Sequence, residues 1–152
     1  MTKSSFEYPP QESFGFLIRD LHRAINKDLA KKIAPSNLTT AQWFFLRSLW
    51  EKDGISQREL SRSVGLTEPT TVAALKVMER NGLIQRNRDK LDTRKIIVKL
   101  ARKGRALKKK LLPYVRGINE RLLEDFSQKE TDKLMNTLRR LTLHMEEITS
   151  DS

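Results

Sequence analysis

The side chains in this sequence that can do chemistry are mainly its cations. The chain has 152 residues, of which 30 are Lys or Arg and 19 are Asp or Glu, so its net charge is +11. Residues 76–110 contain 14 of these cations and three acids, so this segment carries the whole excess and the rest of the chain is neutral. A localised basic segment favours a polyanionic partner, and the alternative is a solvated charged face.

The residue groups that catalysis and metal binding require are missing from the sequence. There is no cysteine, which excludes disulfides, thiolate metal sites and thiol redox chemistry. The two histidines, His22 and His144, lie far apart, and the acids are scattered over the surfaces of expected helices. Neither a glycine-rich phosphate loop nor an H-E-x-x-H motif is present. We therefore expect no enzyme activity, no metal site and no cofactor.

Apolar spacing predicts that helices carry most of these side chains. Apolar residues recur at steps of three and four over 11–33, and again in segments that start at capping-box patterns. The three boxes are Thr39 to Gln42, Ser56 to Glu59 and Ser127 to Glu130. From 102 onward a long helical pattern contains Pro113, which should bend or split it.

The central part of the chain changes from helical to alternating spacing. A short helix after Ser56 closes at Gly65, and Thr67 caps the next helix, with Pro69 in its first turn. Residues 83–86 and 95–100 then read as two strands around a charged connection. This order predicts a helix-turn-helix, whose second helix can lie in a major groove, followed by a hairpin wing.

The connection between the two strands is strongly basic. It carries Arg88, Lys90 and Arg94, and such a loop can enter the minor groove beside the groove-reading helix. Asp92 stands two residues before Arg94, where its carboxylate can hold and aim the guanidinium. The alternative is a small α+β domain whose hairpin is solvated and has no binding role.

With these features, residues 38–104 resemble the winged helix-turn-helix of MarR-family transcription regulators. The matching stretches are LTTAQWFFLRSL (38–49), SQRELSRSVGLTEPTTV (56–72), MERNGLIQR (78–86) and DTRKIIVKLARKG (92–104). The resemblance implies a mainly α fold with a small β-hairpin wing (α+β), in which N- and C-terminal helices pair two copies into a homodimer on palindromic DNA. One departure is Leu100-Ala101, where the family usually has Leu-Thr, and it removes a helix cap.

The expected organisation is an N-terminal arm (1–10), dimerisation helices (11–37 and 102–150) and a DNA-binding lobe (38–101). Leu75 and Met78 should face the core of the lobe, and Val72 is either core or DNA-facing. The expected DNA-contacting residues are Ser56, Arg58, Arg62, Thr67, Pro69, Thr70, Ala73, Lys76, Arg86, Arg88, Lys90, Asp92 and Arg94. Few of those on the second helix of the helix-turn-helix, the one that Thr67 caps, can read bases bidentately. We therefore expect wing and phosphate contacts to carry much of the specificity.

The resemblance also implies release of DNA by a small effector, and repression as the commoner outcome. The family's ligand crevice lies between the dimer helices and the lobe, and we expect Arg19, His22, Trp43 and Arg47 there. An aromatic ring with cations around it suits the binding of a small aromatic acid or an acyl-thioester. Alternatively, Trp43 packs in the core and His22 lies at the dimer interface, and neither lines the ligand crevice.

The function we expect is that of a sequence-specific, double-stranded DNA-binding transcription regulator. A non-specific architectural DNA binder without an effector and a helical protein-interaction dimer are the alternatives. No run of apolar residues approaches the ~18–20 of a membrane span, and no secretory signal pattern opens the chain. We therefore expect a cytoplasmic, nucleoid-associated protein of a bacterium or archaeon that contacts no membrane.

Overall fold

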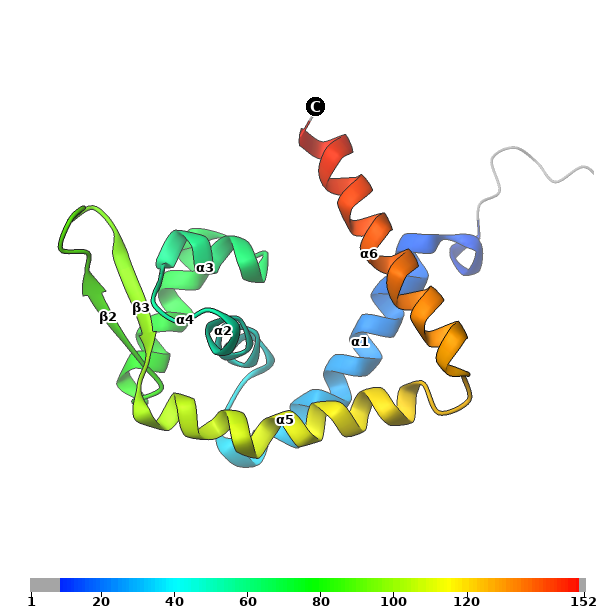
Figure 1. The fold of residues 1–152 in the computed structure, drawn as a ribbon, viewed down its shortest axis with the longest axis horizontal. Helices are drawn as coiled ribbons and strands as arrows, with labels where there is room; N and C mark the ends of the chain where they lie inside the picture. The colour runs from blue at the N-terminus through cyan, green and yellow to red at the C-terminus, as the bar shows by residue number, and fades with distance from the viewer. Residues whose placement is uncertain (1–8, 151–152) are drawn as a thin grey trace, which may run out of the picture. The chain divides into compact units, whose positions relative to one another are not determined.

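The computed structural model describes residues 9–150, which form helices and one small sheet (Figure 1). The helices, in chain order, are α1 (Phe14–Ile33), α2 (Thr40–Glu51), α3 (Gln57–Val64), α4 (Glu68–Arg80), α5 (Arg102–Leu122) and α6 (Gln128–Ser150). Two short 3₁₀ turns are η1 (Pro10–Glu12) and η2 (Ala34–Ser36), and the strands are β1 (Ile55–Ser56), β2 (Ile84–Arg88) and β3 (Ile96–Leu100). The predicted fold class is confirmed. No helix in this described part combines the length and apolar content of a membrane span.

The chain divides inside α5 into two compact units, one ending at Val115 and one beginning at Arg116. The N-terminal unit contains the sheet and the helices that pack on it. Most of the predicted arm, residues 1–8, lies outside the described residues. Pro10–Glu12 form η1, so α1 begins at Phe14, after the cap at Ser13, rather than at the predicted Gln11.

All three predicted capping boxes form. The backbone N–H of the third helical residue donates to the cap hydroxyl, and the side chain of that residue accepts from the backbone N–H of the cap. These paired bonds measure 3.2 and 3.1 Å for Thr39 and Gln42, 3.2 and 2.9 Å for Ser56 and Glu59, and 3.3 and 2.9 Å for Ser127 and Glu130. Each box therefore fixes the residue at which a helix starts.

The connection between α3 and α4 is set by its backbone and by a buried polar chain. Gly65 has a φ of 70°, a left-handed conformation that favours glycine and ends α3. Below it the Thr71 hydroxyl donates to the Ser61 hydroxyl (3.1 Å), which donates to the Leu66 carbonyl oxygen (2.6 Å). Because Ser61 and Thr71 are buried, these bonds satisfy both hydroxyls and hold the two helices at one angle.

The sheet has three antiparallel strands in the order β1-β3-β2. The predicted hairpin of β2 and β3 is present, and Figure 1 shows it standing beside α4. Strand β2 continues to Arg88, past the predicted end at Arg86, because Asn87 and Arg88 pair with Ile97 and Ile96. Strand β1 was not predicted, and it pairs Ile55 with Val98.

Helix α5 runs without interruption past Pro113. Of the two effects expected of Pro113, the split is therefore wrong, and the bend stays a prediction. Proline removes one i to i−4 hydrogen bond, but the other hydrogen bonds of this 21-residue helix remain. Pro113 also lies on the exposed side of the helix, where no packed neighbour is disturbed.

The core of the lobe forms around α2. Its buried apolar residues come from every element of the lobe and include Phe45, Leu46, Leu49, Leu60, Leu75, Met78, Leu83, Ile84, Val98 and Leu100. The predicted inward positions of Leu75 and Met78 are confirmed. The first turn of α5 closes this core, because the Trp50 indole N–H donates to the Gly104 carbonyl oxygen (3.0 Å) and a Cβ at position 104 would collide with the Leu83 carbonyl oxygen.

Candidate nucleic-acid interface

Helix α4 turns one polar face outward. The positions expected to face DNA are all exposed: Thr67, Pro69, Thr70, Ala73 and Lys76. Thr71, Leu75 and Met78 alternate with them and are buried, whereas Val72 is half-buried between the two faces. The outward face is therefore small and nearly neutral, with Lys76 as its cation.

At the tip of the wing, Arg94 is held by Asp92. The guanidinium donates from Nε to Oδ1 (3.0 Å) and from Nη2 to Oδ2 (3.2 Å), and the backbone N–H of Arg94 also donates to Oδ1 (3.1 Å). The side-chain bonds hold the pKa of Asp92 below its usual value and raise the pKa of Arg94. Arg94 nevertheless remains 89% exposed, so the predicted aiming contact is confirmed and leaves the cation open to a ligand.

The other two predicted cations of the wing tip are also exposed. Arg88 donates from Nη1 to the Thr93 carbonyl oxygen (3.2 Å), which ties the end of β2 across the loop. Lys90 lies at the loop itself. Together with Arg94, these residues give the tip a concentrated positive charge.

Arg86 does not point outward as the sequence suggested. Its side chain is 16% exposed and donates from Nε (3.1 Å) and Nη2 (2.8 Å) to Oε2 of Glu79, while its backbone N–H donates to Oε1 (2.9 Å). These bonds hold the pKa of Glu79 below its usual value. Arg86 therefore joins the base of the wing to the end of α4.

The predicted residues of α3 separate into one buried cap and two exposed cations. The Ser56 hydroxyl is used inside its capping box, where it donates to Glu59 (2.7 Å). Arg58 and Arg62 are exposed, and Nε of Arg58 lies 3.5 Å from Oε1 of Glu68. Glu68, the first residue of α4, is an acid of this surface that the sequence analysis did not single out.

An open hollow of about 660 Å³ brings the start of α3, the start of α4 and the wing together. Its lining residues are Ser56, Gln57, Arg58, Glu68, Asp92, Arg94, Lys95 and Ile96. Three of them are cations and two are acids. The structure thus assembles in one place residues that span 41 positions of the sequence, from 56 to 96.

The four residues expected at an effector site are not gathered in one place. Trp43 is 3% exposed and packs edge-to-face on Trp50, with ring centroids 5.4 Å apart, which is the core alternative. On α1, the exposed Arg19 lies over the ring of Phe16 (4.4 Å), and the exposed His22 is hydrogen-bonded to Asn26 (3.0 Å).

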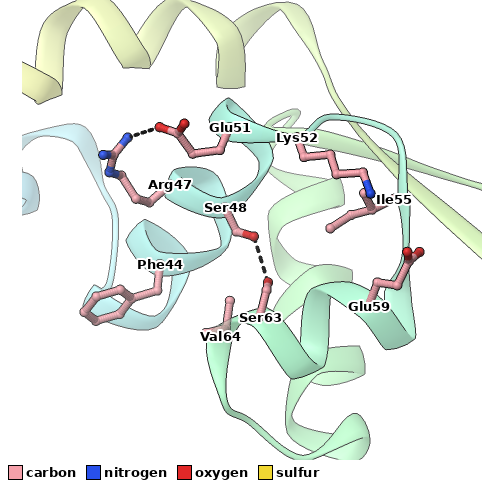
Figure 2. Close-up of a pocket in the computed structure, with 9 residues that line it drawn as sticks. All are labelled: Phe44, Arg47, Ser48, Glu51, Lys52, Ile55, Glu59, Ser63 and Val64. Carbon is pink, nitrogen blue, oxygen red and sulfur yellow. Dashed lines mark hydrogen bonds and ion pairs between the residues drawn. The ribbon is translucent and has the colours of Figure 1, made fainter. Parts of the chain in front are cut away.

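The fourth of these residues, Arg47, lines a second open hollow, of about 530 Å³, between α2 and α3 (Figure 2). Its walls are formed by Phe44, Arg47, Ser48, Glu51, Lys52, Ile55, Glu59, Ser63 and Val64. Arg47 bonds Glu51 (2.7 Å), and the hydroxyls of Ser48 and Ser63 lie 2.7 Å apart. Phe44 supplies the aromatic ring here, because the turn of α2 that buries Trp43 exposes its neighbour.

No cluster of three or more His, Asp or Glu side chains within residues 9–150 is arranged to hold a metal ion.

Comparisons with known proteins agree with this arrangement. The model of the MarR family matches residues 38–96. The HTH-type transcriptional regulator TtmR of Methylorubrum extorquens is 33% identical over 104 residues, which are 67% of this chain and 53% of TtmR. The chain thus spans about half the length of that relative.

Solved structures extend the likeness beyond the lobe. A MarR transcriptional regulator from Methanosarcina mazei Go1 matches with a TM-score of 0.83 and 28% identity, over 88% of this chain and 96% of that one. The transcriptional repressor CouR, bound to a 23-mer DNA duplex, matches with a TM-score of 0.80 and 28% identity, over 91% and 99%. All three of these proteins are transcription regulators.

Proposed function

The chain belongs to the MarR family of transcription regulators, not to an enzyme family, and on that premise we propose that it binds double-stranded DNA as a homodimer and represses transcription. The observation that supports this most strongly is the hollow that joins the start of α4 to the wing. It brings the start of α4 and the wing, which we propose to read the major and minor grooves, to one surface with Arg58, Arg94 and Lys95.

In this proposal the outward face of α4 lies in the major groove and the wing lies in the adjacent minor groove. Thr67, Thr70 and Lys76 contact phosphates or base edges, and Pro69 and Ala73 offer small apolar contacts to thymine methyl groups. Arg94, aimed by Asp92, reaches the floor of the minor groove. Because the outward face of α4 offers few side chains that can read a base bidentately, groove shape contributes much of the specificity.

The phosphate contacts come from exposed cations on three elements: Arg58, Arg62, Lys76, Arg88 and Lys90. Arg86 is removed from this set because Glu79 already occupies its guanidinium. Each neutralised phosphate contributes a log–log salt slope of about −0.9, so a dimer with roughly 6–10 contacts binds far more weakly at moderate salt.

The dimer is supported by exposed apolar side chains on α1 and on α6. On α1 the residues Phe14, Leu17, Ile18 and Leu21 follow one helical face and are exposed. On α6 a stripe of Leu134, Leu141, Met145 and Ile148 is exposed as well, and none of its 23 residues is buried. Two-fold pairing covers such faces and sets two α4 helices one DNA turn apart, about 34–36 Å, on a pseudo-palindromic site.

We also propose that a small aromatic or anionic effector releases the DNA. The hollow between α2 and α3 supports this, because it offers the Phe44 ring and the Arg47 guanidinium on neighbouring turns of one helix. The effector role of Arg19, His22 and Trp43 stays a prediction without geometric support. Substituting Arg47 by Ala should blunt the response to effector more than it weakens operator binding.

Selection of DNA from a random pool tests the proposed function. The full chain is used to select duplexes at moderate salt, and the dissociation constants for selected and random duplexes are then compared. We expect a preference of about 10³ or more for a site with two inverted halves. Equal affinity for both duplexes favours instead the non-specific architectural DNA binder.

A further inference from the structure

One apolar side chain stands at the tip of the basic wing. Leu91, in the loop between β2 and β3, is 99% exposed, while the large apolar residues of the strands beside it pack on the lobe. Single exposed leucines are common on protein surfaces and need no explanation by themselves. This one differs because hydrogen bonds hold the loop around it and because its neighbours carry charge.

The loop holds Leu91 outward through its backbone. Oδ1 of Asp89 accepts hydrogen bonds from the backbone N–H groups of Leu91 (2.8 Å) and Asp92 (2.8 Å). The backbone N–H of Asp89 donates to the Lys95 carbonyl oxygen (2.9 Å), and that of Lys95 donates to the Asp92 carbonyl oxygen (2.9 Å). The tip is therefore preorganised, and little conformational entropy is lost when the Leu91 side chain meets a ligand.

The surroundings of Leu91 decide what kind of ligand fits. Arg88, Lys90 and Arg94 are exposed beside it, and every other residue from 88 to 95 is polar. The apolar surface is thus one side chain wide, far smaller than a protein interface requires. Cations around an apolar point match the minor groove of DNA, where two rows of phosphates flank sugars and stacked base edges.

We propose that Leu91 is a minor-groove wedge, which enters beside Arg94 and opens one base step. The inference rests on the proposed function, since it assumes that the wing lies in the minor groove. Leucine is one of the side chains that act as wedges between base steps in minor-groove binders. Pyrimidine–purine steps open most easily, so the chain should prefer such a step under each wing tip.

Affinity measurements over a range of salt concentrations test the wedge on a duplex that the full chain selects. Because its side chain touches no packed core, Leu91→Ala leaves the fold unchanged by circular dichroism. It should weaken binding by about tenfold with the same salt slope, because an apolar contact and not a charge is lost. Leu91→Met should bind like the wild type. The matched control Lys90→Ala should reduce the slope by about 2 for the dimer, one phosphate at each tip.

A fluorescent base gives the second readout. With 2-aminopurine at the step under the wing, the wild type and Leu91→Met should raise the fluorescence of the duplex, and Leu91→Ala should not. The wedge is overturned if Leu91→Ala binds as tightly as the wild type while Arg94→Ala binds more weakly, and the proposed function then stands. Weaker binding without a fluorescence difference overturns insertion between bases. Equal binding of the wild type to selected and random duplexes overturns the proposed function itself.

Discussion

The lobe of residues 38–101 and helix α6 differ in where they place their apolar residues. In the lobe, α2 alone buries six of its 12 residues, and the strands and neighbouring helices close around it. Helix α6 has nearly twice that length and an equally regular apolar stripe, yet it buries none. Amphipathic spacing therefore predicts a face that must be covered, but not whether the same chain covers it.

The largest expected effect comes from removing a core side chain of the lobe. Phe45 is completely buried, so Phe45→Ala should lower the free energy of unfolding by about 3–5 kcal/mol. Urea denaturation followed by circular dichroism measures this loss. Phe44→Ala, one residue earlier on the exposed face of α2, is the matched control and should cost well under half as much. Similar losses for both would contradict the division of α2 into an inner and an outer face.

A charge in the α6 stripe should break the dimer without unfolding the lobe. Leu141→Glu places a carboxylate among apolar residues that we propose to be covered by the second copy, so we expect monomers by light scattering. Leu143→Glu is the control, because Leu143 is also exposed but lies two residues away, on another side of the helix. Dimers with Leu141→Glu would show that α6 does not need a partner.

A charge removed from the wing should separate DNA binding from dimerisation. Arg94→Ala should weaken binding to a selected duplex by about tenfold and reduce the salt slope, with the dimer intact. Asp92→Asn separates the effect of charge from the effect of aiming, since it makes the wing more positive but removes the carboxylate that holds Arg94. We nevertheless expect weaker binding, because Arg94 loses the carboxylate that aims it. Tighter binding of Asp92→Asn in a fluorescence anisotropy titration would mean that charge alone matters.

The smallest effect concerns the ion pair that joins the wing to α4. Glu79→Gln should lower the free energy of unfolding at neutral pH by about 1 kcal/mol. The pKa of Glu79 is lowered in the folded chain, so its contribution is full above the unfolded value near 4.5 and is lost as the pH falls below it. Stability curves of wild type and Glu79→Gln should therefore converge at acidic pH. A constant gap across that range would contradict this account.

Much of the lobe could be predicted because its signals are local. The capping boxes, the turn at Gly65 and the pairing of Asp92 with Arg94 each depend on residues a few positions apart, whose contacts follow from backbone geometry. The resemblance to the MarR family added the expectations of a homodimer, a palindromic DNA site and a small effector.

What could not be predicted depends on contacts between distant residues. Strand β1 has two residues, and Ser56 also serves as a helix cap, so no alternating pattern exposes its pairing with β3. The direction of Arg86 depends on its bonds to Glu79, and the burial of Trp43 rather than Phe44 depends on which side of α2 packs against the rest of the lobe. Each of these is decided by tertiary packing rather than by spacing.

The close packing of Gly104 limits how the first turn of α5 can move. Since no side chain fits between this residue and the Leu83 carbonyl oxygen, and Trp50 bonds the backbone there, the first turn of α5 cannot slide along the base of the wing. The two form one stiff joint. We therefore expect the first turn of α5 and the base of the wing to move together, so that the position of the hairpin follows that of the turn.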